Sequence, residues 1–401
     1  MRICVLGAGI VGLATAWQLR QHGHEITVID RDQPGHGASG GNGAQLSYSY
    51  VAPLADPGIW GQLPKLLLAA DSPLKLRPRL DPLQWLWGLR FLAACRAGTA
   101  QATTAQLLKL AFESRAAFDA MRAQLRPDCD FSATGKLVLY DSPEGLAGAR
   151  RQLDMQRALG SQQQMVSAQE CVAIEPALDG YRRHIAGAVY TPSECAADCL
   201  KLCQALAADG VALLLQTEVQ GWVQRGGRAV AVKTPTGEIE ADAFVVALGT
   251  ASHALGRPLG VYLPVYPLKG YSITLAADPA LGAAPRVSVT DSARKVVFAR
   301  LGARLRVAGM AEIVGADARI PPARIQTLID ATQAVFPQCS GGFDAPAPWT
   351  GMRPATPTGL PIVGRVGRAP ANVLFNTGHG ALGFTLAFGT AARIAAQLTA
   401  G

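Results

Sequence analysis

The first thirty residues contain three glycines in the order G-x-G-x-x-G, at Gly7, Gly9 and Gly12. An apolar run, Ile3 to Leu6, precedes them, and a helix-forming segment, Leu13 to Gln21, follows. In this setting the first glycine permits a tight turn, the second lets the backbone approach a pyrophosphate, and the third lets helix and strand pack closely. The sequence therefore predicts a dinucleotide site at a helix N-terminus, where the helix dipole favours an anion.

An acidic residue, Asp30, follows the glycine motif at the position where dinucleotide-binding folds contact the ribose. A second apolar run, Glu25 to Ile29, predicts a strand that ends at Asp30. The carboxylate of Asp30 can accept hydrogen bonds from ribose hydroxyls, and its charge disfavours a ribose 2′-phosphate, so we expect NAD or FAD rather than NADP. The glycines also interrupt the apolar run that a signal peptide would need, and we expect no secretory leader.

The chain is too long for one compact core. Its 401 residues predict two interleaved domains, and an apolar content of 49% supports a well-buried interior. No uninterrupted apolar stretch reaches the roughly 18 to 20 residues of a membrane-spanning helix. The net charge of +8 is spread along the chain without a dense basic run. It therefore favours an anionic cofactor, carboxylate substrates or an acidic membrane surface over nucleic acid.

The eight cysteines favour reduced thiols in the cytosol. Cys195, Cys199 and Cys203 are four residues apart, so a helix over Ala196 to Ala208 would bring them to one face. The segment lacks the tight C-x-x-C loops of typical metal sites, and cysteine is among the most buried residue types. We expect core packing here and no metal.

Apolar periodicity divides the rest of the chain into alternating strands and helices. We expect an antiparallel sheet within Val261 to Arg319, where hairpin-like turns join the strand-like segments. Gly249 follows another predicted strand, at the kind of strand end where open α/β sheets bind ligands. Other helices are expected at Ala105 to Leu125, Arg150 to Leu159 and Pro322 to Phe336, and strands at Lys136 to Tyr140, Ala186 to Tyr190, Val211 to Leu215, Val219 to Gln224 and Phe244 to Leu248.

Residues 57 to 98 differ from the rest in composition. Trp60, Trp85 and Trp87 lie among six basic residues, and prolines interrupt any long helix. A helix that carries Trp and Arg suits either the protein core or the interface of a membrane, and both interpretations stay open.

The end of the chain returns to glycine-rich turns and a final helix, so the chain starts and ends in the same domain. We assign residues 1–56, 195–256 and 351–401 to a discontinuous nucleotide-binding domain. Residues 57–194 and 257–350 are assigned to a substrate domain.

Several longer stretches match one known family. They are GAGIVGLATAWQL, GHEITVIDRD, ASGGNGAQLS, VYPLKGYSITL, RVAGMAEIVG, WTGMRPATPTGLPIVGR and NTGHGALGFTLA. On these stretches, which reach nearly from end to end, the sequence resembles the FAD-dependent D-amino-acid oxidase superfamily, most closely the bacterial D-amino-acid dehydrogenases of the small-subunit type. The resemblance implies an α/β (α+β overall) fold, with a Rossmann-like FAD-binding domain and an interleaved substrate domain built on an antiparallel sheet.

The resemblance also implies FAD as the cofactor and indicates which residues hold it. The last helix would face the flavin N1–C2=O edge with its N-terminus, where negative charge develops on reduction. From the pyrophosphate to this edge, the implied residues are Gly7, Ala8, Gly9, Gly12, Asp30, Arg31, Ser39, Asn42, Gly43, Ala44, Gln45, Val219, Gly249, Gly378, His379, Gly380, Leu382 and Gly383.

Three residues are implied on the substrate side. Arg353, in the stretch TGMRP, matches the family position that faces the substrate, where a guanidinium can grip an amino-acid carboxylate bidentately. Tyr271 can donate a hydrogen bond to the same carboxylate, and Tyr50 can cap the pocket. Ordinary core packing remains the alternative for both tyrosines.

The hypothesis that follows is oxidative deamination of a D-amino acid to a 2-oxo acid and ammonia, by hydride transfer from Cα to flavin N5. The resemblance implies a quinone-type electron acceptor and a cytoplasmic enzyme, with peripheral contact to the inner membrane through residues 58–98 as a further hypothesis. Two alternatives stay open: a dehydrogenase or oxidase of secondary amino acids such as hydroxyproline, proline or sarcosine, and a non-catalytic flavin-binding protein.

Overall fold

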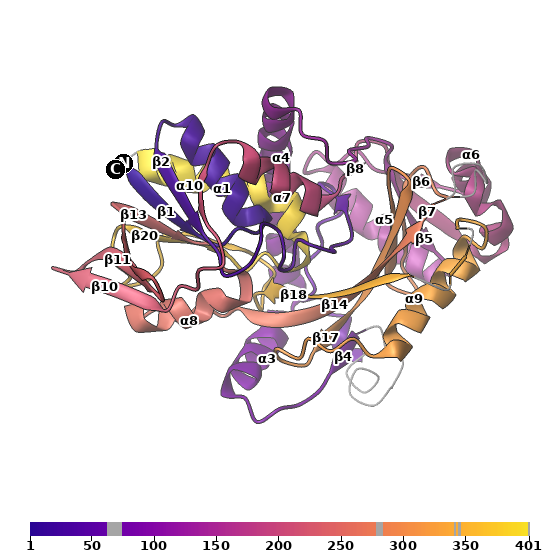
Figure 1. The fold of residues 1–401 in the computed structure, drawn as a ribbon. Coiled ribbons are helices and arrows are strands. Elements are labelled where there is room, and N and C mark those ends of the chain that lie inside the picture. Colours follow the sequence, from indigo (N-terminus) through magenta and orange to yellow (C-terminus); the bar gives the residue numbers. More distant parts are fainter. Residues whose placement is uncertain (62–73, 278–283, 341, 344–345, 400–401) are drawn as a thin grey trace.

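The protein is described by a computed structural model, which covers residues 1–61, 74–277, 284–340, 342–343 and 346–399. Two large sheets lie side by side, with helices packed around them, and the two chain termini lie together at the end that carries β1 and β2 (Figure 1). Residues 62–73, within the segment for which a membrane interface was considered, lie outside the described part. The mixed α/β architecture expected from the sequence, with helices around one mostly parallel and one mostly antiparallel sheet, is present.

The first sheet contains the N-terminal strand and has six strands. Its order is β19-β20-β13-β1-β2-β9, and all neighbouring pairs are parallel except β19 with β20. Apolar residues alternate between its two faces, because successive side chains of a strand point in opposite directions. The strands are β1 (Arg2–Leu6), β2 (Glu25–Ile29), β9 (Ala212–Leu214), β13 (Ala243–Val246), β19 (Ile362–Gly364) and β20 (Val373–Thr377).

Different elements cover the two faces of this sheet. Ile3 and Val5 of β1 pack toward a core shared with four helices, whereas Cys4 and Leu6 pack toward a second core beneath a small antiparallel sheet. The helices are α1 (Ile10–Gln21), α4 (Ala97–Leu125), α7 (Cys199–Ala208) and α10 (Gly383–Thr399); the small sheet is β10 (Gly221–Arg225), β11 (Arg228–Thr234) and β12 (Gly237–Glu240).

The second large sheet forms the other half of the molecule. Its order is β18-β14-β17-β16-β15-β5-β7-β6, and β4 pairs with β17 beside this path. Its pairs are antiparallel except β15 with β5 and β17 with β4, so the antiparallel sheet expected within 261–319 is present. The strands are β4 (Leu74–Leu76), β5 (Lys136–Tyr140), β6 (Gln164–Val166), β7 (Gly187–Thr191), β14 (Tyr266–Ala276), β15 (Ser288–Asp291), β16 (Val296–Leu301), β17 (Arg304–Ile313) and β18 (Ala347–Ala355).

Shorter elements complete the described structure. A two-stranded link, β3 (Gln45–Leu46) with β8 (Cys195–Ala196), joins the loop after β2 to the start of α7. The remaining helices are α3 (Pro82–Ala94), α5 (Pro143–Arg157), α6 (Ala168–Ile174), α8 (Ser252–Gly256) and α9 (Pro322–Val335), with 3-10 turns η1 (Pro176–His184), η2 (Gly249–Ala251), η3 (Arg257–Leu259) and η4 (Gly380–Leu382).

The cysteine-rich segment differs from its sequence prediction. Cys195 lies in β8, so only Cys199 and Cys203 share the helix, which starts at Cys199 because Asp198 caps it by accepting from the amides of Leu200 and Lys201. All eight cysteines are buried and free. Within the described residues, no group of three or more side chains has the arrangement of a metal site.

Two elements do not follow the predicted division into domains. The boundary at residue 351 falls within β18, which stays in the second sheet to Ala355. Helix α4 was assigned to the substrate domain, yet its Leu107 and Phe118 pack in the core beneath the first sheet, where Phe118 meets Phe388 of α10. The division into the two proposed domains stays a prediction.

One helical stretch of the described chain, Gly380–Thr399, is long and apolar enough to span a membrane by length and composition. It packs against α1 and α4, and 61% of its most apolar window is buried inside the protein. Core packing accounts for its apolar composition, because a helix that is apolar on most sides is typical of a large interior.

Candidate active site

A cavity of about 1200 Å³ runs between the two large sheets. The glycine turn after β1, the loop 36–56, the end of β13, the middle of β17, β18 and the start of α10 all line it. Small-molecule pockets measure roughly 300 to 1,000 Å³, so this cavity has room for a dinucleotide and a small second ligand. Most of the predicted cofactor residues line it; Ala8, Gly12 and Gly378 do not.

The glycine turn has the close contacts that its motif predicts. A Cβ on Gly12 would lie 1.8 Å from the carbonyl oxygen of Gly7, and one on Gly7 would lie 2.5 Å from the carbonyl oxygen of Ala247. A Cβ on Gly9 would meet only the Ser39 hydroxyl, at 3.5 Å. Gly7 and Gly12 therefore serve the packing of turn, helix and sheet, whereas Gly9 leaves its backbone open to the cavity, as a pyrophosphate requires.

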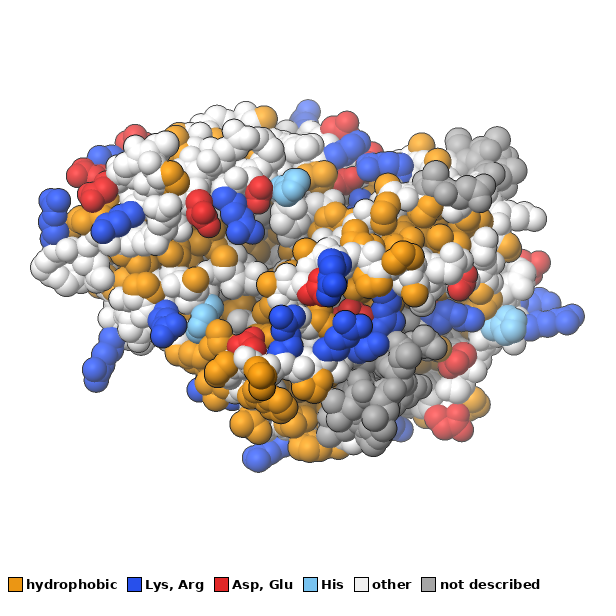
Figure 2. All heavy atoms as spheres, turned by 60° about the horizontal axis from the view of Figure 1, so that its bottom comes forward, with side chains coloured by type: hydrophobic (Ala, Val, Ile, Leu, Met, Phe, Trp, Pro, Cys, Tyr) orange, Lys and Arg blue, Asp and Glu red, His pale blue; other side chains and the backbone are white. Residues whose placement is uncertain are grey.

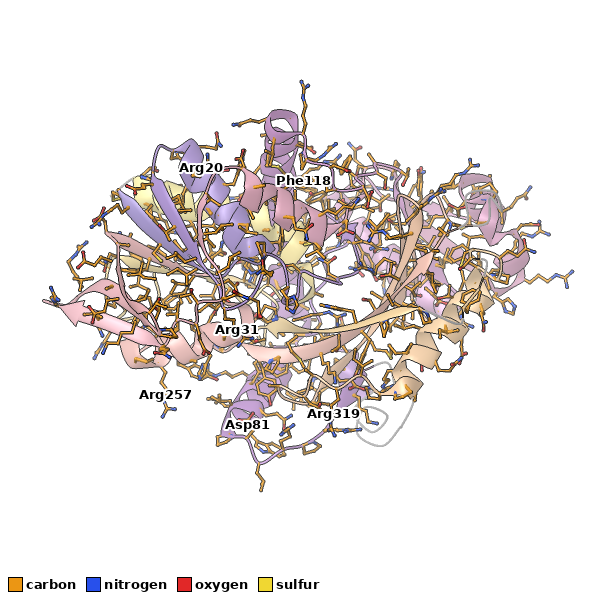
Figure 3. All side chains as sticks on the ribbon, viewed as in Figure 1. Arg20, Arg31, Asp81, Phe118, Arg257 and Arg319 are labelled. Carbon is orange, nitrogen blue, oxygen red and sulfur yellow. The ribbon has the colours of Figure 1, made fainter. Side chains whose placement is uncertain are left out.

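Asp30 lies at the carboxyl end of β2, where the sequence predicts a ribose contact. One carboxylate oxygen accepts from the amide of Ala8 at 2.6 Å and the other from the amide of Asp32 at 2.9 Å, so the side chain is held in place. Arg31 is exposed, pairs with Asp32, and lies near the middle of the molecule in Figure 3. Val219 and Gly249 line the same end of the cavity, and all four residues fit an adenosine site.

The loop after β2 crosses the cavity and is tied to both sheets. Ser39 accepts from the amide of Ile10 at 3.0 Å, at the first turn of α1. Asn42 accepts from the amide of Ala44, which adopts φ 59°, and the Gln45 side chain donates to carbonyl oxygens of β15 and β16. Gly43 faces Val297, which a Cβ would approach to 3.0 Å. The loop is therefore fixed where a flavin would lie against it.

The turn before α10 is built from glycines in the left-handed region. Gly378 has φ 80° and Gly380 has φ 55°, and Leu382 and Gly383 follow at the start of the helix, lining the cavity. His379 is buried, contacts Thr390 of α10 through Nε2 at 3.0 Å, and burial lowers the pKa of its imidazole to about 3. Its ring is therefore neutral near pH 7, and the local electrostatics come from the helix N-terminus.

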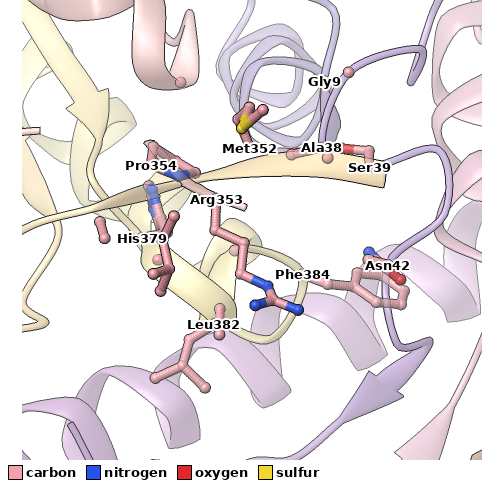
Figure 4. A pocket seen from close by; sticks show the side chains of 18 of the residues that line it. Gly9, Ala38, Ser39, Asn42, Met352, Arg353, Pro354, His379, Leu382 and Phe384 are labelled. Carbon is pink, nitrogen blue, oxygen red and sulfur yellow. The ribbon is translucent and has the colours of Figure 1, made fainter. Parts of the chain in front are cut away.

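Arg353 projects from β18 into the cavity. Figure 4 shows its guanidinium extending toward the side where Leu382, Phe384 and Asn42 lie. Its Nη1 donates to the carbonyl oxygen of Met310 at 2.9 Å, and burial without an offsetting charge lowers the pKa of the guanidinium to about 10. It forms no ion pair among the described residues. A desolvated guanidinium without an acidic partner is a strong site for a carboxylate.

The two predicted tyrosines also line the cavity but differ in their bonding. The hydroxyl of Tyr271 donates to Glu312 at 2.8 Å, and Glu312 pairs with Arg324, so this hydroxyl has a protein partner. Burial beside the Glu312 carboxylate raises the pKa of Tyr271. Tyr50 lies under the ammonium of Lys136, 4.4 Å from its ring centroid, and burial raises its pKa. The predicted substrate contacts of both tyrosines stay predictions.

The structure adds site residues that the sequence analysis missed. Met310 has φ 61° at a bulge opposite Gly270, and a Cβ on Gly270 would lie 2.3 Å from Nη2 of Arg353. Trp349 lines the cavity with its ring against Gly41, where a Cβ would come within 2.4 Å. Lys136 also lines it, although it is only 3% exposed. The sequence signal that could have pointed to this part of the site was the unusual spacing of the glycines in PWTGM and PLKGY.

Comparisons with known proteins agree with this geometry. The chain matches the FAD dependent oxidoreductase family over residues 2–398. It is 51% identical to D-amino acid dehydrogenase 2 of Ralstonia nicotianae, over 98% of this chain and 96% of that protein. It is 45% identical to D-amino acid dehydrogenase 2 of Pseudomonas aeruginosa, over 99% and 94%.

Solved structures show the same fold at lower identity. Glycine oxidase from Geobacillus kaustophilus aligns with a TM-score of 0.78 at 22% identity, over 100% of this chain and 95% of that one. L-proline dehydrogenase from P. horikoshii aligns with a TM-score of 0.76 at 18% identity, over 100% and 93%. The cavity, its glycine turn and the full-length match together show that this chain belongs to the family of FAD-dependent oxidoreductases.

Proposed function

We propose that this protein is a D-amino acid dehydrogenase, which oxidises a D-amino acid to a 2-oxo acid and ammonia. The observation that carries the proposal is Arg353, whose half-buried guanidinium lines the cavity and whose one hydrogen-bond partner among the described residues is the Met310 carbonyl. Support also comes from relatives named D-amino acid dehydrogenase, to which the chain aligns over nearly its whole length.

The residues of the chain account for binding and orientation. Arg353 holds the substrate carboxylate, and the Met310 carbonyl fixes the plane of its guanidinium, so one face of Cα is presented to the cofactor. The neutral amine provides the electron pair that forms the C=N bond as hydrogen leaves Cα with its own electron pair, and water then hydrolyses the imine. FAD, when bound, supplies the acceptor for that hydride.

An anaerobic titration of the purified holoenzyme tests the substrate class. D-amino acids, their L-enantiomers and cis-4-hydroxy-D-proline are added in turn while the flavin absorbance is followed. Bleaching by D-alanine and similar D-amino acids, but not by their enantiomers, is expected. Bleaching by cis-4-hydroxy-D-proline alone would indicate a dehydrogenase or oxidase of secondary amino acids instead. No bleaching by any of these compounds would favour a non-catalytic flavin-binding protein.

For the electron acceptor we propose a quinone, in a cytoplasmic enzyme that touches the inner membrane peripherally. The support is the naming of the relatives as dehydrogenases and one apolar surface, on which Figure 2 shows hydrophobic side chains gathered beside the grey atoms. Stopped-flow reoxidation of the reduced enzyme by a soluble quinone and by oxygen tests the acceptor. Fast reaction with oxygen alone would overturn it.

Helix α3 carries this apolar surface. Trp87 and Phe91 face the core, and the indole of Trp87 donates to the carbonyl oxygen of Ala355 at 2.8 Å. The outer side exposes Trp85 and Leu89, and Leu80 before the helix is fully exposed. Basic side chains flank this surface at Arg77, Arg79, Arg90 and Arg96, which suits an anionic lipid surface.

Flotation with phosphatidylglycerol vesicles tests the membrane contact. The triple variant Leu80→Ser, Trp85→Ser, Leu89→Ser should lose binding, since the apolar side chains that enter the lipid are removed. Leu159→Ser with Leu214→Ser, at exposed leucines elsewhere, is the matched control and should bind as the unmodified protein does. Equal flotation of all three proteins would contradict the proposed contact.

A further inference from the structure

A buried lysine lines the cavity at a distance from the substrate arginine. Lys136 is the first residue of β5, between β15 and β7, and its side chain is 3% exposed. Burial lowers the pKa of its ammonium to about 8. Burying an ammonium is unfavourable unless partners replace the lost water, so such a lysine at a cavity indicates a ligand-directed role.

The protein itself offers this ammonium little compensation. Its Nζ donates to the Ser47 hydroxyl at 2.8 Å and lies over the Tyr50 ring. It forms no ion pair among the described residues. The nearby Glu194 carboxylate favours the charged ammonium from beyond ion-pair distance, and its two oxygens accept from the amides of Tyr48 and Ser49 at 2.6 and 2.7 Å. Up to two of the three ammonium donors therefore remain for a ligand in the cavity.

Ser47 connects this lysine to the start of the last helix. The amide of Ser47 donates to the hydroxyl of Thr385, which is in the first turn of α10, at 3.3 Å. Lys136, Ser47 and Thr385 all line the cavity, as does Gly383. The first turn of α10 is where the pyrimidine edge of the flavin is expected, so the ammonium and the helix N-terminus converge on the same end of the cofactor.

We propose that Lys136 is the cation that stabilises the reduced flavin, acting on the pyrimidine end of the ring together with the N-terminus of α10. Reduction adds a hydride at N5 and leaves a negative charge over N1–C2=O. A fixed ammonium nearby lowers the free energy of that anion and makes the oxidised flavin a better electron acceptor. The inference rests on the FAD of the family and not on the proposed substrate.

The sheet topology separates Lys136 from the substrate carboxylate. Arg353 lies on β18 and reaches Met310 on β17, whereas Lys136 lies on β5, three strands farther along the sheet. At about 4.8 Å per strand, the backbones of β17 and β5 are roughly 14 Å apart along the sheet, so the two cations enter the cavity from different places. The flavin end is therefore the partner that the position of Lys136 favours.

Two measurements on purified holoenzymes test the proposal without any amino-acid substrate. One is the midpoint potential of the bound flavin, obtained by dithionite titration against a reference dye. The other is the affinity for sulfite, whose sulfur lone pair adds to N5 while the displaced electron pair moves onto N1–C2=O. Both respond to charge at the pyrimidine end, and neither depends on which substrate is natural.

Lys136→Met should weaken sulfite binding at pH 7 at least tenfold and lower the midpoint potential. A tenfold change in the equilibrium constant corresponds to about 30 mV for a two-electron couple. Lys136→Arg keeps the charge and should stay close to the unmodified enzyme. Lys295→Met, at an exposed lysine on the rim of the same cavity, is the matched control and should change neither quantity.

The outcomes separate this role from others. An unchanged potential and sulfite affinity in Lys136→Met would overturn the proposal, and a raised KM for acidic D-amino acids with both quantities unchanged would assign the lysine to substrate side chains instead. If Lys136→Met does not retain FAD, Lys136→Gln and Lys136→Arg decide the question, since both have long polar side chains and differ in charge. Equal midpoint potentials in Lys136→Gln and Lys136→Arg would then overturn the proposed role of the lysine.

Discussion

Arg353 on β18 donates from Nη1 to the carbonyl oxygen of Met310 on β17, at 2.9 Å, across the intervening strand β14. Met310 turns this carbonyl toward the guanidinium by adopting φ 61° at a β-bulge, where two residues oppose one on the neighbouring strand. A non-glycine residue in this conformation costs about 1 kcal/mol or more, and such strain is typically retained at functional sites. The bulge thus sets the direction of the half-buried guanidinium that we assign to the substrate carboxylate.

Replacing that arginine should reduce catalysis while leaving the cofactor bound. Arg353→Met should lower kcat/KM for D-alanine by roughly a hundredfold, because about 3 kcal/mol of charge-assisted binding is lost. Flavin absorbance should be retained. The matched control is Arg257→Met, at an arginine that extends into solvent in Figure 3. Steady-state kinetics with both variants check this, and unchanged kcat/KM in Arg353→Met would remove the arginine from the site.

Gly270 should be as sensitive as the arginine it faces. Gly270→Ala places a Cβ 2.3 Å from Nη2 of Arg353, so the guanidinium must move from its Met310 contact. We expect kcat/KM to fall at least about tenfold, since displacing a positioned group by about 1 Å costs rate steeply. Gly148→Ala, in helix α5, is the control: its Cβ would meet only Nη2 of Arg151, at an ordinary contact distance of 3.8 Å, and the variant should keep full activity. Normal kinetics in Gly270→Ala would show that the guanidinium tolerates the shift.

Substitution of two glycines in the N-terminal turn should affect different properties: stability for Gly12 and FAD binding for Gly9. Gly12→Ala puts a methyl group 1.8 Å from the Gly7 carbonyl oxygen, so the apoprotein should lose about 1–3 kcal/mol of stability. Gly9→Ala meets only the Ser39 hydroxyl, at 3.5 Å, so its apoprotein should unfold normally but bind FAD weakly. Thermal unfolding of both apoproteins and their FAD titrations check this contrast. A Gly9→Ala variant with normal FAD affinity would argue against pyrophosphate approach at that residue.

Lys136 should make stability depend on pH in the alkaline range. Its pKa in the folded protein is about 8, below the unfolded value of 10.5, so the folded state releases the proton first as pH rises. The wild type should therefore gain stability relative to Lys136→Met between pH 8 and pH 10, by at most about 1.4 kcal/mol per pH unit. Glu194 and Tyr50 face the ammonium, and burial raises the pKa of each. Urea unfolding of both proteins at pH 7, 8.5 and 9.5 measures the trend, and a constant difference would contradict it.

The sequence by itself determined the nucleotide half of the protein. Gly7, Gly9, Gly12 and Asp30 could be interpreted from local spacing, because a strand, a tight turn and a helix follow one another within thirty residues. The strand at Lys136–Tyr140 was predicted with its observed bounds for the same reason, since its apolar run is short and bounded by turn residues. Helix α7 was predicted one turn too long, because the bridge of Cys195 to β3 is a non-local pairing that overrides helical period.

Only the tertiary structure decided what the substrate half brings together. The Met310 bulge, the space left by Gly270 and the buried ammonium of Lys136 come from segments that are far apart in the chain and meet through strand pairing. Sheet register and side-chain burial depend on long-range contacts that no local pattern encodes. The resemblance had placed Arg353 on the substrate side, but its Met310 partner and the burial of Lys136 at the cavity were therefore beyond the sequence.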